Sequence, residues 1–236
     1  MGMKVTVSDK ATTAVGPHVE RLKISRTLAG PQDTFTARIA YVYVDSQGSA
    51  WMPLVLQRPG ELIPQKDGST YTEKRFWKVP GGKFEPVGDK DILHTASREF
   101  LEETGIFVSP DKLSLDLSVE FEMPSRRLDF DKPAGEHIAH RNIFFLYVTD
   151  KKPSLPLRPR DDKEVEKARL FKLNNLVHLL YLYEGAVLAP SHRDKLAFLF
   201  SNSRCRTLLA AAGVTPAEVK AVLGLTRNKD FKRPFK

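Results

Sequence analysis

The feature that most restricts the fold is the run from Phe35 to Val44, in which nearly every position is apolar or β-branched. A run of this kind predicts a strand that is buried on both faces. The turn sequence Asp45-Ser46-Gln47-Gly48 then leads to a second apolar run, Met52 to Leu56. The two runs and the turn between them predict a β-hairpin.

Further strands are indicated later in the chain. Polar and apolar residues alternate from Leu113 to Phe121, which predicts a strand with one polar face, and two apolar stretches predict strands at 143–148 and 168–173. The polar segments 59–74, 123–137 and 151–160 are predicted to be loops.

Beyond these strands the hydrophobic period becomes helical. It predicts helices from Asn174 to Tyr183 and from Ser191 to Ala212, and a last helix capped by Thr215 and Glu218. We therefore expect a flexible arm over 1–20, a mixed α+β core over 21–185, a helical extension over 186–225 packed on the core, and a basic tail over 226–236.

Composition excludes several classes of protein. With 236 residues, of which 41% are hydrophobic and 28% charged, the chain has the composition of an ordinary soluble protein. Its single cysteine, Cys205, excludes an intrachain disulfide and a Cys-rich zinc site, and favours a reducing, cytoplasmic setting. The longest strongly apolar run, Ile143 to Val148, is too short to cross a bilayer, so we expect no membrane partner.

The net charge favours phosphate-rich partners. Lys and Arg number 37 and Asp and Glu 29, which gives +8. Part of this excess lies in the tail from Arg227 to Lys236, which is either a solvated end or an RNA-binding segment.

The segment from Asp91 to Gly105 has the signals of a helix with one acidic side. Asp91 is placed to cap it and Gly105 to end it. At about 100° per residue, Glu99, Glu102 and Glu103 fall within an arc of about 100°. Three crowded carboxylates repel one another, so the pattern predicts a magnesium site, unless it is simply a solvated acidic face.

The residues around this helix make the pattern specific. Arg98 lies one turn before Glu102, and Pro80-Gly81-Gly82 allows close approach of the backbone to a ligand. The segment resembles the signature box of the Nudix hydrolases, Gly-x5-Glu-x7-Arg-Glu-aliphatic-x-Glu-Glu-x-Gly-aliphatic, and its matching positions are Gly82, Arg98, Glu99, Phe100, Glu102, Glu103, Gly105 and Ile106.

Two departures from the box concern the loop before the helix. Two extra residues separate Gly82 from Arg98, and the central Glu of the box is absent. Asp89 or Asp91 would have to replace that Glu. Because it mainly braces the loop in the family, we expect the change to affect loop geometry more than metal binding.

The resemblance implies a Nudix-like α/β/α sandwich with a mixed sheet, plus the helical extension. It also implies hydrolysis of a nucleoside diphosphate linked to another moiety, with Mg²⁺ or Mn²⁺ as cofactor. Glu102 and Glu103 would bind the metal, Glu99 would bind metal or position water, and Arg98 would brace the site. The expected partners are a small nucleotide-derived substrate and a second copy of the chain in a homodimer.

Residues outside the box are candidates for the remaining roles. Several acids are candidates for the general base, and each is alternatively an ordinary surface acid: Glu136, Glu164, Glu166, Glu120 and Glu122. Arginines suit phosphate binding, Gly81 and Gly82 would approach the substrate, and Trp77 would either stack a base or pack in the core. The candidate arginines are Arg58, Arg126, Arg127 and Arg141.

Substrate identity is only weakly indicated. Pro124 lies two residues beyond the position at which ADP-sugar members of the family tend to have a proline, which slightly favours an ADP-sugar. The basic stretches 151–160 and 227–236 favour the alternative of an enzyme acting on the 5′ end of RNA. The altered loop favours a third possibility, a non-catalytic nucleotide sensor or regulator.

Overall fold

The fold is known from a computed structural model, which describes residues 4–6, 34–58, 62–64, 70–72, 75–124, 139–160, 164–176 and 186–224. The strands are β1 (Lys4–Thr6), β2 (Thr34–Val44), β3 (Ala50–Gln57), β4 (Leu62–Pro64), β5 (Thr70–Thr72), β6 (Phe76–Lys78), β7 (Gly81–Lys83), β8 (Ser118–Pro124), β9 (Ala139–Thr149), β10 (Val165–Lys172) and β11 (Val187–Leu188). The α-helices are α2 (Ile92–Thr104), α3 (Pro190–Ser201), α4 (Ser203–Ala211) and α5 (Pro216–Gly224).

A mixed sheet forms the centre of the molecule. Its order is β1-β8-β9-β2-β3-β6-β11, with β10 paired to β3 and β7 paired to β2. β2 runs parallel to β9 and antiparallel to β3, to which the predicted hairpin connects it. Gly48 has a positive φ of 76° in the turn of that hairpin, a conformation that glycine adopts without a steric penalty.

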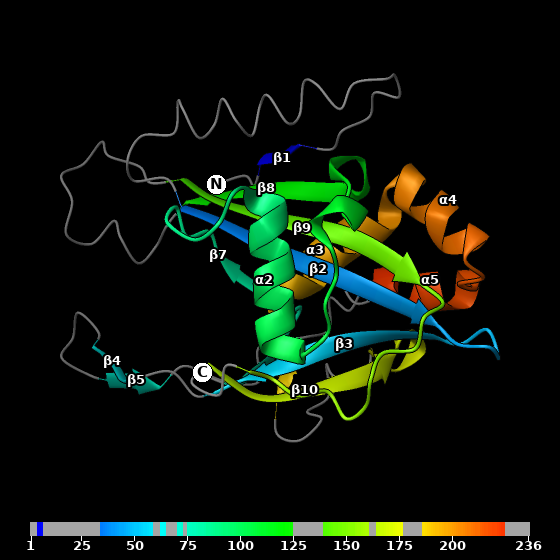
Figure 1. Cartoon of the computed structure of the whole chain (residues 1–236), viewed down its shortest axis with the longest axis horizontal. Coiled ribbons are helices and arrows are strands. Elements are labelled where there is room, and N and C mark those ends of the chain that lie inside the picture. Colours follow the sequence, from blue (N-terminus) through cyan, green and yellow to red (C-terminus); the bar gives the residue numbers. More distant parts are fainter. Residues whose placement is uncertain are drawn as a thin grey trace.

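Helices cover both faces of this sheet (Figure 1). Along β2, Ile39 and Tyr41 belong to the core beneath α2, while Ala40 and Val42 belong to the core beneath α3, α4 and α5. This alternation confirms the strand buried on both faces. It also confirms the α/β/α sandwich with a helical C-terminal region. No helix in the described ranges is long and apolar enough to span a membrane.

Three predicted elements were wrong in their bounds. The strand predicted from Leu113 starts only at Ser118, because 115–117 form a 3-10 turn in which the Ser114 hydroxyl accepts a hydrogen bond from the Asp116 N–H. The predicted loop 59–74 contains the antiparallel pair β4 and β5. The single helix predicted over 191–212 is divided into α3 and α4, because the Asn202 side chain caps a new helix start by accepting from the N–H groups of Arg204 and Cys205.

Other predicted elements agree with the structure or lie beyond what it describes. The last helix has the predicted capping box, in which the Thr215 N–H donates to Glu218 and the Glu218 N–H donates to the Thr215 hydroxyl. The first residues of the predicted helix over 174–183 belong to a 3-10 turn over 173–176. Residues 177–183 lie outside the described residues. The bounds of the arm, core, extension and tail stay predictions.

Candidate active site

The site is built on helix α2 and on the strand that precedes it. Asp91 caps the helix by accepting from the N–H groups of Leu93 and His94, and Gly105 ends it in the left-handed region at φ 76°. Ile92, Ala96 and Phe100 are buried against the sheet, so the acidic side of the helix is turned to the edge of that contact. Both ends of α2 are thereby fixed as the sequence predicts.

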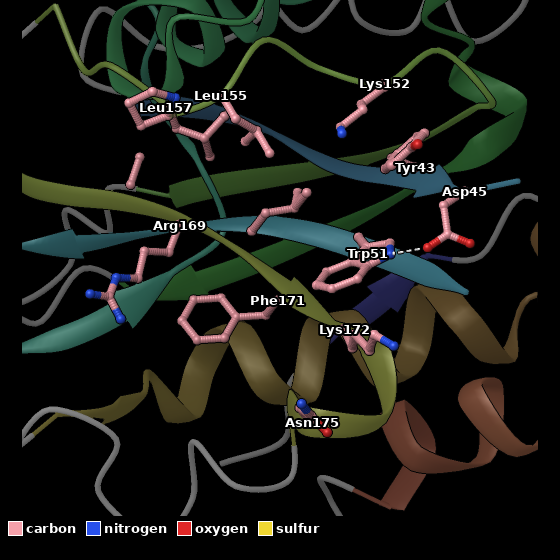
Figure 2. A pocket seen from close by; sticks show the side chains of 13 residues that line it. Tyr43, Asp45, Trp51, Lys152, Leu155, Leu157, Arg169, Phe171, Lys172 and Asn175 are labelled. Carbon is pink, nitrogen blue, oxygen red and sulfur yellow. Dashed lines mark hydrogen bonds between the residues drawn. The ribbon is translucent and has the colours of Figure 1, made fainter. Parts of the chain in front are cut away.

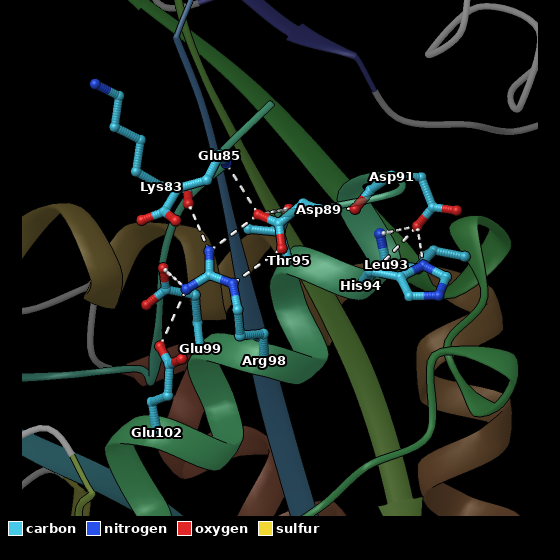
Figure 3. Close-up of polar contacts among 10 residues, drawn as sticks. All are labelled: Lys83, Glu85, Asp89, Asp91, Leu93, His94, Thr95, Arg98, Glu99 and Glu102. Carbon is cyan, nitrogen blue, oxygen red and sulfur yellow. Dashed lines mark hydrogen bonds and ion pairs between the residues drawn. The ribbon is translucent and has the colours of Figure 1, made fainter. Parts of the chain in front are cut away.

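Arg98 holds two of the carboxylates together (Figure 3). Its Nη1 lies 3.0 Å from Glu99 Oε1 and 3.0 Å from Glu102 Oε2. A single guanidinium thus sets the relative position of the first and second acids of the helix. The predicted role of Arg98 as a brace agrees with this geometry.

Asp89 holds the opposite side of the same guanidinium. Its Oδ1 accepts from Arg98 Nε at 2.9 Å and its Oδ2 from Arg98 Nη2 at 2.9 Å, which makes a bidentate pair. Asp89 also accepts from the Thr95 hydroxyl and from the Glu85 N–H, and these donors lower the pKa of its carboxyl although burial acts in the opposite direction. Of the two acids considered for the place of the missing box Glu, Asp89 therefore contacts Arg98 and closes the loop, whereas Asp91 caps the helix.

Glu103 is directed to the glycine segment rather than to Arg98. Its Oε2 accepts from the Gly81 N–H at 2.6 Å. Gly81 itself has a φ of 134°, and a Cβ on it would lie 2.1 Å from the Ala37 carbonyl oxygen. A Cβ on Gly82 would lie 2.2 Å from Glu99 Oε2. A larger residue at position 81 would therefore collide with the backbone of β2, whereas one at position 82 would force the Glu99 carboxylate to move.

Two carboxyls of the site are difficult to ionise. Desolvation by burial raises the pKa of Glu99 to about 7 and that of Glu103 to about 7, and each is raised further by neighbouring carboxylates. Nearby cations act in the opposite direction but are insufficient: Arg98 for Glu99, and Arg38 for both acids. When all are ionised, the acids of the site place four negative charges beside the two positive charges of Arg38 and Arg98; these acids are Asp89, Glu99, Glu102 and Glu103.

Arg38 is a residue of the site that sequence reasoning missed. It lies on β2, and its Nη1 donates to the carbonyl oxygens of Val79 and Gly81, the first at 2.9 Å. Burial lowers its pKa, while Glu103, Glu99 and Glu164 oppose that shift. Its Nε has no acceptor among the described residues. The available signal was a lone arginine within an apolar run that predicts a doubly buried strand.

Helix α3 supplies two more buried polar residues that were missed. His192 Nδ1 accepts from the Val79 N–H at 3.0 Å, and burial lowers the pKa of this imidazole well below its ordinary value. Lys195 lies with its Nζ 5.4 Å from the Phe144 ring centroid, and burial lowers its pKa to about 8. The C-terminal region thus contacts the strand that leads into the glycine segment.

The predicted general bases and phosphate-binding arginines lie outside the box, and the structure places only some of them near its acids. Glu164 is exposed and close enough to Glu103 to raise the pKa of that acid. Its carbonyl oxygen accepts from the Arg58 N–H, which places Arg58 beside it. Arg141 forms an ion pair on the sheet, with its Nη1 3.6 Å from Glu120 Oε1. Arg126, Arg127 and Glu136 lie outside the described residues.

For Trp77 the structure decides between the two roles considered. Its side chain is fully buried and meets the Phe171 ring edge to face, with centroids 4.9 Å apart. The ring is therefore part of the core, and the interpretation of Trp77 as a stacking platform for a base was wrong.

The acidic side chains of the site are the candidate ligands for a metal ion. In the ranges that the structure describes, no three acidic, histidine or cysteine side chains converge so as to hold a metal. Glu99 and Glu102 are instead directed to Arg98, and Glu103 to Gly81. The chemistry of the site still fits magnesium, because this ion prefers carboxylate oxygens and would neutralise the excess charge at Glu99 and Glu103.

Comparison with known proteins identifies the family. The family model described as NUDIX domain matches residues 36–189, well over half of the chain. The chain belongs to the Nudix family. This match confirms the resemblance to the family that the sequence predicts. The comparison with curated proteins finds none that matches.

The chain is also similar to solved Nudix structures at low sequence identity. The NUDIX domain of Shewanella oneidensis NrtR, complexed with ADP ribose, is 14% identical, covers 83% of this chain and 99% of its own, and has a TM-score of 0.47. A bifunctional NMN adenylyltransferase/ADP ribose pyrophosphatase from Francisella tularensis is 19% identical, with a TM-score of 0.44, and the match covers 83% of this chain. A MutT/nudix family protein from Enterococcus faecalis is also 19% identical, with a TM-score of 0.39 over 65% of this chain. The present chain spans only 46% of the Francisella protein and 50% of the Enterococcus protein.

Proposed function

We propose that this Nudix protein is a divalent-metal-dependent hydrolase that cleaves the pyrophosphate of a nucleoside diphosphate linked to another moiety, with an ADP-sugar slightly favoured. The observation that carries the proposal is the pair of carboxyls, Glu99 and Glu103, which burial keeps at a pKa of about 7 beside Gly81 and Gly82. Near neutral pH such acids are only partly ionised, and a cation bound beside them would favour their ionised form.

Each residue of the site then has a part in the reaction. Glu99, Glu102 and Glu103 would hold Mg²⁺ or Mn²⁺, with Arg98 as the brace. When bound, the metal would supply positive charge for the pyrophosphate and lower the pKa of an attacking water. Arg38 fixes the carbonyls of Val79 and Gly81, and so holds the glycine segment against Glu99 and Glu103. Glu164, exposed beside these acids, is the general-base candidate among the described residues and would accept a proton from the water.

A panel of substrates tests the proposal. ADP-sugars, dinucleoside polyphosphates and NADH would each be incubated with the protein and either Mg²⁺ or Mn²⁺, and release of a nucleoside monophosphate would be measured by chromatography. We expect turnover with at least one ADP-sugar and its loss in Glu103→Gln. Glu85→Gln is the matched control, because Glu85 is exposed and lies outside the helix. No turnover on any substrate with either metal would contradict a small-nucleotide hydrolase.

One observation supports the RNA alternative. The segment 151–160 is attached to the end of α2, since the Arg158 N–H donates to the Thr104 carbonyl and the Arg160 N–H to the Glu102 carbonyl. The exposed Arg158 therefore lies beside the box helix, and Lys151 and Lys152 are exposed at the other end of the same segment. Hydrolysis of a 5′-triphosphorylated RNA that falls steeply with salt would support this alternative. Turnover unaffected both by salt and by removal of residues 226–236 would contradict it.

A further inference from the structure

A second cavity lies away from the carboxylates of α2, between the segment 151–160 and strands β3 and β10 (Figure 2). Its volume is about 1130 Å³. The part of β10 that lines it begins at Ala168 and ends at Lys172, whereas Glu164 precedes the strand. At about 3.3 Å per residue, Ala168 lies about 13 Å and Lys172 about 26 Å along the strand from Glu164. The cavity is therefore separate from the candidate active site.

Apolar surface faces this cavity from two sides. On the sheet, Trp51 is half-buried, and its Nε1–H donates to Asp45 Oδ2 at 2.8 Å, which fixes the plane of the indole. Across from the sheet, the segment 151–160 contributes Leu155 and Leu157, and Leu155 is 54% exposed. A flat apolar group between these sides would bury surface that is otherwise in contact with water.

The charge around the cavity favours an anion. Among the described residues that line it, Lys152, Arg169 and Lys172 are cations and Asp45 is the one acid. Asp45 already accepts from Trp51 and from the Gln47 and Ser49 N–H groups, and these hydrogen bonds lower its pKa. The Lys172 Nζ lies 5.0 Å from the centroid of the Trp51 ring, so a cation stands at the edge of the apolar surface.

We propose that this cavity is a binding site for a small anion with a flat apolar body. The body lies between Trp51 and the Leu155–Leu157 wall, and the anionic group lies at Lys152 and Lys172. This site goes beyond the hydrolase function and does not depend on it.

The wall of the cavity also contacts the active-site helix. Arg158 and Arg160, which follow Leu157, donate from their N–H groups to the carbonyls of Thr104 and Glu102 at 3.2 and 2.6 Å. A Cβ on Gly105 would lie 2.7 Å from the Arg158 carbonyl oxygen, so the segment is packed tightly on the end of α2. A ligand that orders the wall therefore stabilises the hydrogen bonds that hold the last turn of α2.

A pair of probes tests the charge requirement. Anilinonaphthalene sulfonate is an anion with a flat apolar body, and N-phenyl-1-naphthylamine has the same rings without the sulfonate. We expect one sulfonate probe per chain by fluorescence titration, and a Kd at least tenfold higher in Lys152→Gln/Lys172→Gln, with the neutral probe changed less than twofold. The control Arg206→Gln/Lys220→Gln removes two exposed cations outside the cavity lining and should leave both values unchanged.

Two further variants locate the site. Leu155→Asp should weaken both probes, and because Leu155 is largely exposed the fold should persist, which circular dichroism would check. Glu103→Gln should bind the sulfonate probe normally, so failure of the hydrolase proposal is distinguishable from failure of this one. Equal binding in wild type and the double lysine variant, or equal losses in the control, would overturn the proposal.

Hydrogen exchange tests the link to α2. The Arg158 and Arg160 amides should exchange more slowly when the sulfonate probe saturates the cavity. Unchanged exchange at both amides would overturn this part of the inference.

Discussion

Replacing Glu103 by Gln should stabilise the metal-free protein at alkaline pH while abolishing its activity. Glutamine keeps the size of the side chain and an oxygen that accepts from the Gly81 N–H. What it removes is a charge that burial makes costly. The pKa of Glu103 is about 7 rather than 4.5, and this difference corresponds to about 3 kcal/mol of unfolding free energy once the acid is ionised. That pKa already includes the attraction of Arg38, so replacement by a neutral glutamine should give a net gain of up to about 3 kcal/mol.

The sign of the pH dependence follows from the raised pKa. Below about pH 4.5 the acid is protonated in both folded and unfolded chains, so wild type and Glu103→Gln should differ little. Between pH 4.5 and 7 the unfolded chain has already lost the proton that the folded chain retains, so wild type loses stability relative to the variant. The full difference should be present above about pH 7.

Urea unfolding in EDTA, followed by circular dichroism at pH 4.5 and pH 8, measures this difference. Adding Mg²⁺ at pH 8 should raise the stability of wild type more than that of Glu103→Gln, and turnover of the variant should fall at least 100-fold. A variant that is unfolded, or equal in stability to wild type at pH 8, would refute the reasoning. Undiminished turnover would show that Glu103 has no catalytic role.

Substitutions at three further positions test the supports of the site. Asp89→Asn should lower the unfolding free energy by about 3 kcal/mol in urea, because the buried end of its ion pair with Arg98 loses its charge; a loss below 0.5 kcal/mol would contradict a bracing role. Gly82→Ala should weaken Mg²⁺ binding in calorimetry at least tenfold, since the new methyl group occupies the position of the Glu99 carboxylate; unchanged affinity would show that this acid moves freely. His192→Ala should cost about 1–3 kcal/mol by leaving the Val79 N–H buried without an acceptor. His192→Asn should restore most of that loss, and equal losses in both variants would point to packing instead.

Local signals predicted the parts of the fold that local interactions determine. Asp91 and Gly105 begin and end α2 because capping depends on residues within one turn of the helix. The alternation of polar and apolar residues wrongly predicted a strand at 113–117, where the Ser114 hydroxyl competes with strand hydrogen bonding. It is a weak signal wherever serines and aspartates supply the polar positions.

The predicted site was most complete where its residues are close in sequence. Arg98, Glu99 and Glu102 lie on one helix, so helical spacing places them together. Asp89 could be named only as one of two candidates, because the choice depends on how the loop closes. His192 has no sequence signal of its role, since its partner Val79 lies 113 positions earlier.

That long separation affects how the protein is made. The glycine segment and α2 leave the ribosome while the helix that supplies His192 has yet to be synthesised. During this interval Val79 lacks its acceptor, and the apolar face of the sheet that α3, α4 and α5 later cover is in contact with solvent. Nascent chains stalled before residue 190 should therefore bind chaperones that recognise apolar surface, and catalytic competence should arise only after the C-terminal helices have docked.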